Sequence, residues 1–73
     1  MKLKPGVYHH YKNKDYRVLQ TAKDHETLAD LVVYEPLYDN PAAQCFVRPL
    51  KEFIGEVEVY GKKQPRFKFI KDE

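Results

Sequence analysis

Apolar and polar residues alternate along several short stretches of this chain, and this pattern limits its fold more than any other feature. The alternation is clear at residues 7–11, 15–22, 56–60 and 66–70. Successive side chains of a strand point to opposite faces, so a period of two is typical of half-buried β-strands. Turn-forming residues (Gly, Pro, Asn and Asp) separate the stretches. The sequence therefore predicts a mainly β protein.

Two further strands are expected in the middle of the chain. Residues 28–34 form the most apolar segment, and we expect them to be the central strand. Residues 45–48 form a short strand that Pro49 stops. A helix over residues 24–31, capped by Asp24, is the alternative for the beginning of the first segment.

Short strands at intervals of about 8–12 residues are typical of a small barrel or sandwich. We predict a partly open β-barrel, SH3-like or similar, of five to six short strands. One short helical turn is expected near residues 49–54, because Pro49 suits a first helical position and Gly55 can end the turn. Asn13 is expected to adopt a left-handed conformation in the first hairpin, and residues 61–65 are expected to be a loop.

Length and composition exclude several classes of protein. Seventy-three residues allow one domain, which we place over residues 1–73. With 42% hydrophobic and 33% charged residues, the chain is too apolar for disorder and too polar for a membrane protein. The single cysteine excludes an intramolecular disulfide framework. No charged and apolar leader follows Met1, so we expect a cytoplasmic protein.

Six motifs in a fixed order resemble the DUF1653 family, a group of short prokaryotic proteins of unknown function. They are Gly6-x-Tyr8-x-His10-Tyr11-Lys12, Tyr16-x-Val18, Ala22-x-x-His25-Glu26-Thr27, Leu31-Val32-Val33-Tyr34-x-x-Leu37-Tyr38, Val47-Arg48-Pro49-Leu50-x-x-Phe53 and Pro65-Arg66-Phe67. The resemblance covers nearly the whole chain. It implies that the motifs belong together in one compact domain, and it implies no activity.

The chain departs from the usual family pattern at two motif positions. Asn13 stands where the family usually has glycine; asparagine also tolerates a left-handed turn, so the hairpin is still expected. Phe46 stands where the family usually has tryptophan, which removes an indole N–H donor.

The histidines raise two functional alternatives, a metal site and an acid/base pair. His10, His25 and Glu26 could form a two-histidine, one-carboxylate metal site. No local spacing such as H-E-x-x-H supports that arrangement, so we expect no metal, no cofactor and no catalytic residue. The enzymatic alternative uses His10 or His25 with Glu26 as an acid/base pair in a pocket. The structural alternative is that residues 25–27 fix a tight turn through hydrogen bonds to backbone N–H groups.

Cys45 is expected in the strand over residues 45–48, as a small buried apolar residue rather than a nucleophile.

Arg48 and Arg66 stand next to prolines at the ends of predicted strands, where each can present a rigid guanidinium to a phosphate or carboxylate. The alternative is an internal ion pair with a glutamate. Lysines and tyrosines near the hairpins also suggest stacking of a nucleic acid beside basic groups. The net charge of only +2 and the interspersed carboxylates favour an ordinary solvated face instead.

We therefore predict a non-enzymatic binding module for an anionic ligand: a nucleotide, a phosphate-bearing metabolite or a nucleic acid. The alternatives are a protein-interaction or accessory domain and, third, a hydrolytic enzyme based on His and Glu. A monomer or homodimer without membrane association is expected. The candidate ligand-binding residues are Tyr8, His10, Lys12, His25, Glu26, Thr27, Tyr34, Arg48 and Arg66.

Overall fold

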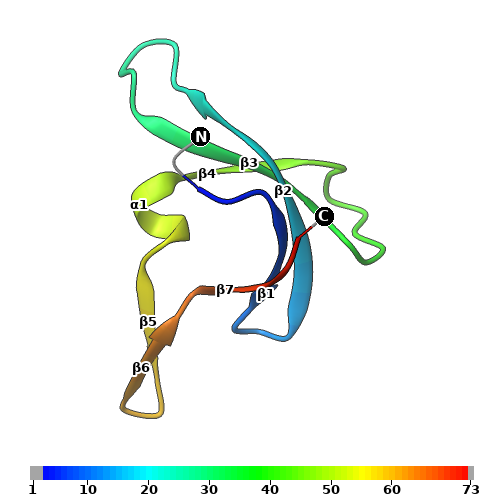
Figure 1. Ribbon diagram of the computed structural model, residues 1–73, viewed down its shortest axis with the longest axis vertical. Coiled ribbons are helices and arrows are strands. Elements are labelled where there is room, and N and C mark those ends of the chain that lie inside the picture. The colour runs from blue at the N-terminus through cyan, green and yellow to red at the C-terminus, as the bar shows by residue number, and fades with distance from the viewer. Residues whose placement is uncertain (1–2, 73) are drawn as a thin grey trace.

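The computed structural model describes residues 3–72 and contains seven strands and one short helix within that range (Figure 1). In chain order they are β1 (Gly6–His10), β2 (Lys14–Lys23), β3 (Asp30–Pro36), β4 (Phe46–Pro49), α1 (Leu50–Phe53), β5 (Glu56–Val59), β6 (Lys62–Pro65) and β7 (Phe67–Lys71). The mainly β fold class is confirmed, and the expected helical turn is α1.

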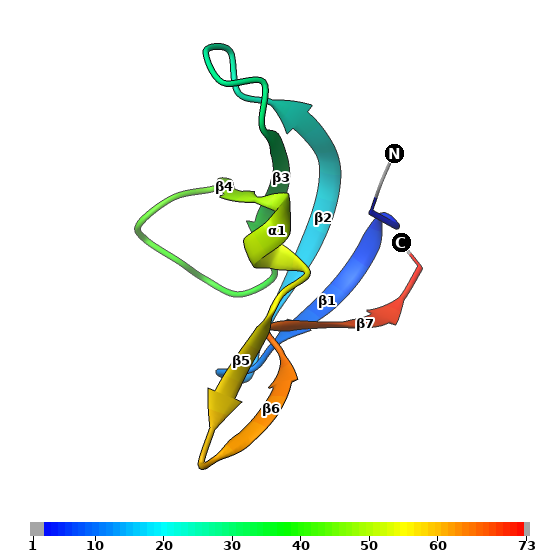
Figure 2. The ribbon, with the colours of Figure 1, turned by 90° about the vertical axis from the view of Figure 1, so that its left-hand side faces the viewer.

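Five strands form one antiparallel sheet in the order β4-β3-β2-β1-β7, and β5 pairs with β6 in a second sheet. The larger sheet curves around α1 but does not close, so the domain is an open curved sheet rather than a closed barrel (Figures 1 and 2). The expected number of strands was too low because residues 62–65, predicted as a loop, form β6.

The central strand of the large sheet is β2, which pairs with both β1 and β3. The prediction that residues 28–34 are central is wrong, because β3 lies second from the edge. The register of β2 shifts between Val18 and Gln20, a β-bulge that increases the local twist of the sheet. Curvature of this strand turns its inner side chains toward α1.

Residues 24–29 form a turn, and the alternative helix over residues 24–31 is absent. The Asp24 carboxylate accepts hydrogen bonds from the backbone N–H groups of Glu26 (2.9 Å) and Thr27 (3.0 Å). Leu28 has a φ of 62°, which ends any helical path and delays the start of β3 to Asp30. Asp24 therefore caps a turn instead of a helix.

The two hairpin turns place residues in the left-handed region. Asn13 has a φ of 67°, which confirms the expectation for the first hairpin. Between β5 and β6, Tyr60 (φ 52°) and Gly61 (φ 77°) form a two-residue turn with the dihedral pattern of type I′. Gly61 is a typical residue for this turn and Tyr60 is not, which explains why the sequence pattern did not indicate β6.

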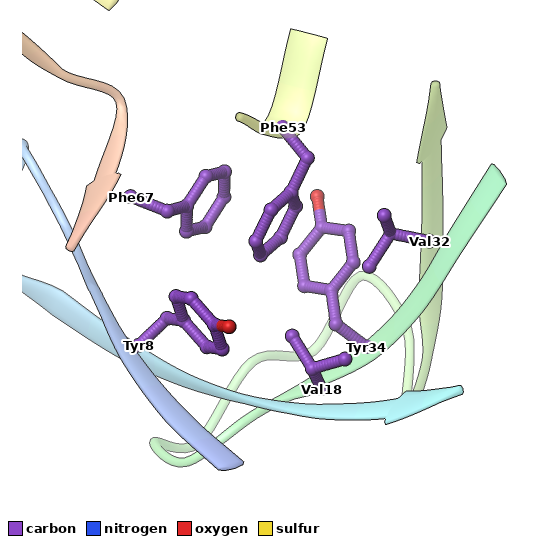
Figure 3. Packing of buried hydrophobic residues seen from close by; sticks show 6 residues of the cluster. All are labelled: Tyr8, Val18, Val32, Tyr34, Phe53 and Phe67. Atoms are coloured by element: carbon purple, nitrogen blue, oxygen red, sulfur yellow. The ribbon is translucent and has the colours of Figure 1, made fainter. Parts of the chain in front are cut away.

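The core lies between the concave face of the large sheet and α1 (Figure 3). Its members are Tyr8, Val18, Val32, Tyr34, Phe53 and Phe67. The rings of Phe53 and Phe67 stack with centroids 3.9 Å apart and planes 6° apart. Tyr8 and Tyr34 meet the Phe53 ring edge-on, each at 5.4 Å. One helical side chain therefore connects three strands of the sheet.

We expect Phe53→Ala to lower the free energy of unfolding by about 3–5 kcal/mol, because Phe53 is 1% exposed and a cavity would replace its ring. A domain of this size has a total stability near the lower end of about 5–15 kcal/mol, so the variant should be largely unfolded at 37 °C. Urea denaturation followed by circular dichroism measures the change. Ile54→Ala, at an exposed neighbouring position, is the control; equal losses in both variants would contradict this description of the core.

Candidate anion-binding site

The structure brings together some of the predicted site residues and separates others. His10 pairs with Lys14 at the beginning of β2, whereas His25, Glu26 and Thr27 follow the end of the same strand. Ten residues of strand span about 30 Å, so these two groups do not share one site. The alternative metal site of His10, His25 and Glu26 is not formed.

The turn at residues 24–29 has a structural explanation. The hydrogen bonds that Asp24 accepts from Thr27 and Glu26 lower the pKa of its carboxyl group. The Thr27 hydroxyl accepts a hydrogen bond from the backbone N–H of Ala29 (3.2 Å). His25 and Glu26 are exposed on this turn. Tyr8, another predicted site residue, is a core side chain whose hydroxyl donates a hydrogen bond to the carbonyl oxygen of Lys4 (2.6 Å).

A cluster of aromatic and arginine side chains lies along the inner side of the large sheet. We call it the aromatic–arginine cluster; its members in contact are His10, Tyr16, Tyr34, Phe46, Arg48 and Phe67, and Arg66 is included because its positive charge acts on His10. The strand register explains the assembly, because His10 is paired with Phe67 and Tyr34 with Phe46. Residues far apart in sequence thus meet across β1, β2, β3, β4 and the beginning of β7.

Arg48 is held in place by three contacts. Its Nε donates a hydrogen bond to the Tyr34 hydroxyl oxygen (3.2 Å), and its Nη1 pairs with Glu52 Oε1 (2.7 Å). Its guanidinium carbon lies 5.6 Å from the centre of the Phe67 ring, a cation–π distance. For Arg48, the internal ion pair that the sequence left open is therefore present, and its partner is Glu52.

Arg66 differs from Arg48 because its side chain lacks such an acidic partner. Within residues 3–72, its Nε is buried without a hydrogen-bond acceptor, and no carboxylate pairs with the guanidinium. Its backbone is fixed on both sides: its N–H donates to the Gly55 carbonyl oxygen and its carbonyl oxygen accepts from the Tyr11 N–H, each at 3.0 Å. The position of Arg66 is thus defined while its charge is not neutralised.

His10 is a buried, neutral imidazole in this cluster. It is 9% exposed, and its ring centre lies 4.8 Å from that of Phe67. Burial lowers the pKa of His10, and the positive charges of Arg48, Arg66 and Lys12 lower it further. Its Nδ1 accepts a hydrogen bond from the backbone N–H of Lys12 (3.1 Å), so the neutral ring carries its hydrogen on Nε2.

Tyr16 extends the cluster toward the loop after β3. Its hydroxyl and that of Tyr38 are 2.6 Å apart, and Asn40 Nδ2 donates to the Tyr38 hydroxyl oxygen (3.1 Å). Burial and the hydrogen bond with Tyr38 raise the pKa of Tyr16. Tyr16 and Phe67 are absent from the predicted site residues. Alternation along a strand predicts which of its side chains share a face. Only the pairing of β1 with β2 and β7 shows that Tyr16 and Phe67 lie beside His10.

Cys45 is exposed and precedes β4, so the prediction of a buried residue inside a strand is wrong. The chain enters β4 only at Phe46, whose ring packs against Tyr34 with centroids 5.9 Å apart. The Phe46 ring thus lies where the family resemblance implies the indole ring of a tryptophan.

Two surface depressions are lined by residues outside the aromatic–arginine cluster. One, of about 410 Å³, is lined by Val7, Asp15, Arg17, Leu37, Ile70, Lys71 and Asp72. The other, of about 320 Å³, is lined by Glu35, Pro36, Tyr38, Asp39, Asn40, Ala43 and Gln44. Neither is lined by His10, Arg48 or Arg66.

Fold and cluster define a small mainly β domain in which an arginine packs against aromatic rings. Residues 6–69 match the family DUF1653, described as a protein of unknown function, so the chain belongs to this family. A comparison with curated proteins finds no significant match. In the described part of the chain, no helix has the length and hydrophobicity needed to span a bilayer.

A solved structure supports the same conclusion. The chain is similar to a protein belonging to DUF1653 from Bordetella bronchiseptica, determined by crystallography, with 33% sequence identity and a TM-score of 0.91. The match covers 99% of this chain and 92% of the other. The two proteins therefore share the same fold over almost the full length of this chain.

The two adjacent histidines should affect stability in opposite directions with pH. The hydrogen bond to Asp15 raises the pKa of His9, so the stability that this pair contributes is present below pH 6.5 and lost as the pH rises through the folded pKa. The pKa of His10 is lowered, so the unfolded chain binds the proton first and stability is lost as the pH falls below 6.5.

Thermal unfolding at pH 7.5 and pH 5.5 measures these contributions. His9→Gln should lose more stability on acidification than the wild type, and His10→Asn should lose less. Asp15→Asn is the matched control, because it removes the same ion pair as His9→Gln and should behave like it. Identical pH responses of the two histidine variants would contradict the assignment.

Proposed function

We propose that this domain is a non-enzymatic binding module that holds a phosphate-bearing anion at the aromatic–arginine cluster. The observation that carries the proposal is Arg66: its backbone is fixed by two hydrogen bonds, and within residues 3–72 no carboxylate pairs with its half-buried side chain. Arginine binds phosphate through planar, charge-assisted hydrogen bonds.

The charges around the cluster support an anion rather than a cation. Arg48, Arg66 and Lys12 all act on His10 with positive charge, and the carboxylate that pairs with Arg48 is Glu52. Three positive groups and one negative group leave an excess of positive charge. Because Glu52 and the Tyr34 hydroxyl already orient Arg48, little side-chain entropy is lost when a ligand binds there.

The uncharged part of the ligand would contact aromatic rings. Phe46 and Tyr16 are half-buried members of the cluster, so each offers part of a ring to a nucleobase or another flat group. The Nε2–H of neutral His10 is a further donor for a phosphate or carbonyl oxygen. These features favour a nucleotide-like ligand over a free inorganic anion.

Binding is better supported than catalysis. An acid/base histidine usually receives its orientation from an acidic side chain, as in catalytic triads. Here Nδ1 of His10 contacts a backbone N–H, while the histidine bonded to a carboxylate, His9, lies half-buried on the opposite face of β1. We also propose that the protein is prokaryotic and cytoplasmic and that it is a monomer or a homodimer.

We expect a millimolar concentration of ADP to raise the melting temperature of the wild-type domain. Arg66→Ala should weaken ADP binding by about 10- to 100-fold, the value of one or two hydrogen bonds to a charged group. The unliganded variant should keep its stability, because the substitution removes an unsatisfied buried donor. Thermal shift and isothermal titration calorimetry measure the two effects.

Arg17→Gln is the control for loss of positive charge, since Arg17 pairs with Glu35 and lines a different depression. It should bind ADP as the wild type does. The proposal fails if wild type and Arg66→Ala bind ADP, AMP and pyrophosphate equally, or if the wild type binds none of them.

A further inference from the structure

We propose that the ligand is a single-stranded nucleic acid that continues from the aromatic–arginine cluster onto the β5–β6 hairpin. This inference rests on the proposed function and names the ligand class of that site. The hairpin supplies an aromatic tip and a face with one lysine and no carboxylate, and Arg66 follows β6 directly in the chain.

The hairpin is a projecting arm. In the described chain, β5 and β6 pair only with each other, and both views show them extending away from the five-stranded sheet (Figures 1 and 2). An isolated two-stranded hairpin is at best marginally stable in water. Packing of the core therefore does not explain why the chain maintains this arm.

Tyr60 at the tip of the arm is the most unusual residue of the hairpin. Its side chain is 101% exposed, so it contributes no burial to folding. Its φ of 52° lies in the left-handed region, which costs a tyrosine about 1–2 kcal/mol. Unfavourable backbone conformations of this kind are concentrated at functional sites. A fully exposed ring on a projecting arm is suited to stacking with a nucleobase.

The two faces of the hairpin differ in charge. Strand alternation and the register place Val57, Val59, Lys62 and Gln64 on one face and Glu56, Glu58, Lys63 and Pro65 on the other. The first face has a lysine and no carboxylate, and the second carries both glutamates. An anionic strand is therefore expected to lie along the face of Lys62.

The distance between the arm's tip and the cluster fits a short oligonucleotide. Strand β6 has four residues, so Lys62 and Arg66 are about 13 Å apart along the strand. A stacked strand rises about 3.4 Å per nucleotide, so about four nucleotides cover this length. That number is the lower end of the site sizes known for single-strand binding by small β domains.

A second copy of this chain is a less favourable occupant. Antiparallel pairing of two β5 strands in the register that matches their faces would place glutamates opposite glutamates, and like charges in directly opposed positions are destabilising. Two β6 strands would oppose lysines in the same way, and Pro65 has no N–H to donate. A nucleic acid has no such conflict with the lysine face.

The experiment measures binding of a fluorescein-labelled oligothymidylate of eight nucleotides by anisotropy. Tyr60→Asn should weaken binding at least about fivefold, because it removes base stacking. The same change should raise the melting temperature, since Asn-Gly is the preferred type I′ turn. A loss of affinity together with a gain in stability cannot come from partial unfolding. Tyr60→Asn should bind ADP like the wild type.

Salt dependence separates phosphate contacts from folding effects. Lys62→Ala should reduce the slope of log affinity against log salt by about 0.7, the value for one phosphate contact on a single strand. Lys23→Ala is the control and should leave the slope unchanged, because Lys23 is the last residue of β2 and pairs with Asp30.

The possible outcomes distinguish the two proposals. If ADP binds and depends on Arg66, but the oligonucleotide binds no tighter and the arm variants have no effect, this inference is wrong and the proposed function remains. If neither probe binds, both are wrong. If Tyr60→Asn instead changes the sedimentation of the protein alone, the arm contacts a second copy and this inference is also overturned.

Discussion

The stacked contact between Phe53 and Phe67 determines the shape of this domain. Phe53 belongs to a single turn of helix, which would not be stable without tertiary packing. Phe67 begins the last strand, which pairs at the edge of the sheet. By joining these two elements at 3.9 Å, the rings hold the sheet in a curve around α1. The inner side of that curve collects the side chains that form the candidate site.

The same aromatic surface serves the core and the candidate site. The Phe67 ring packs against the rings of Phe53 and Tyr34, and the Arg48 guanidinium lies over the Phe67 ring. Rings of this kind give positive groups a weakly attractive, low-dielectric neighbourhood. This neighbourhood keeps His10 neutral beside two arginines, so the cluster presents positive charge from groups that do not titrate near neutral pH.

The sequence predicted the local elements of this fold better than their arrangement. Alternation indicated strands wherever one face is buried, and the turn at Asn13 followed from a residue that tolerates positive φ. The turn at Tyr60 was not predicted, because tyrosine does not favour the positive φ that this turn requires. Strand β6, which follows the turn, was therefore not predicted either. The site was only partly predictable: Arg48 and Arg66 were indicated by their prolines, but the distance of His25 and Glu26 from them depends on the length of β2.

The self-contained pairing of the β5–β6 hairpin has a consequence for how this domain can diversify. Because neither strand is shared with the large sheet, residues can be added to or removed from the arm without altering any other register. One residue inserted in each strand beside the turn would lengthen the arm by about 3.3 Å. It would also turn the Tyr60 side chain toward the opposite face of the hairpin. Two in each strand would restore the orientation. Related domains could thus change their reach in discrete steps while retaining an unchanged core.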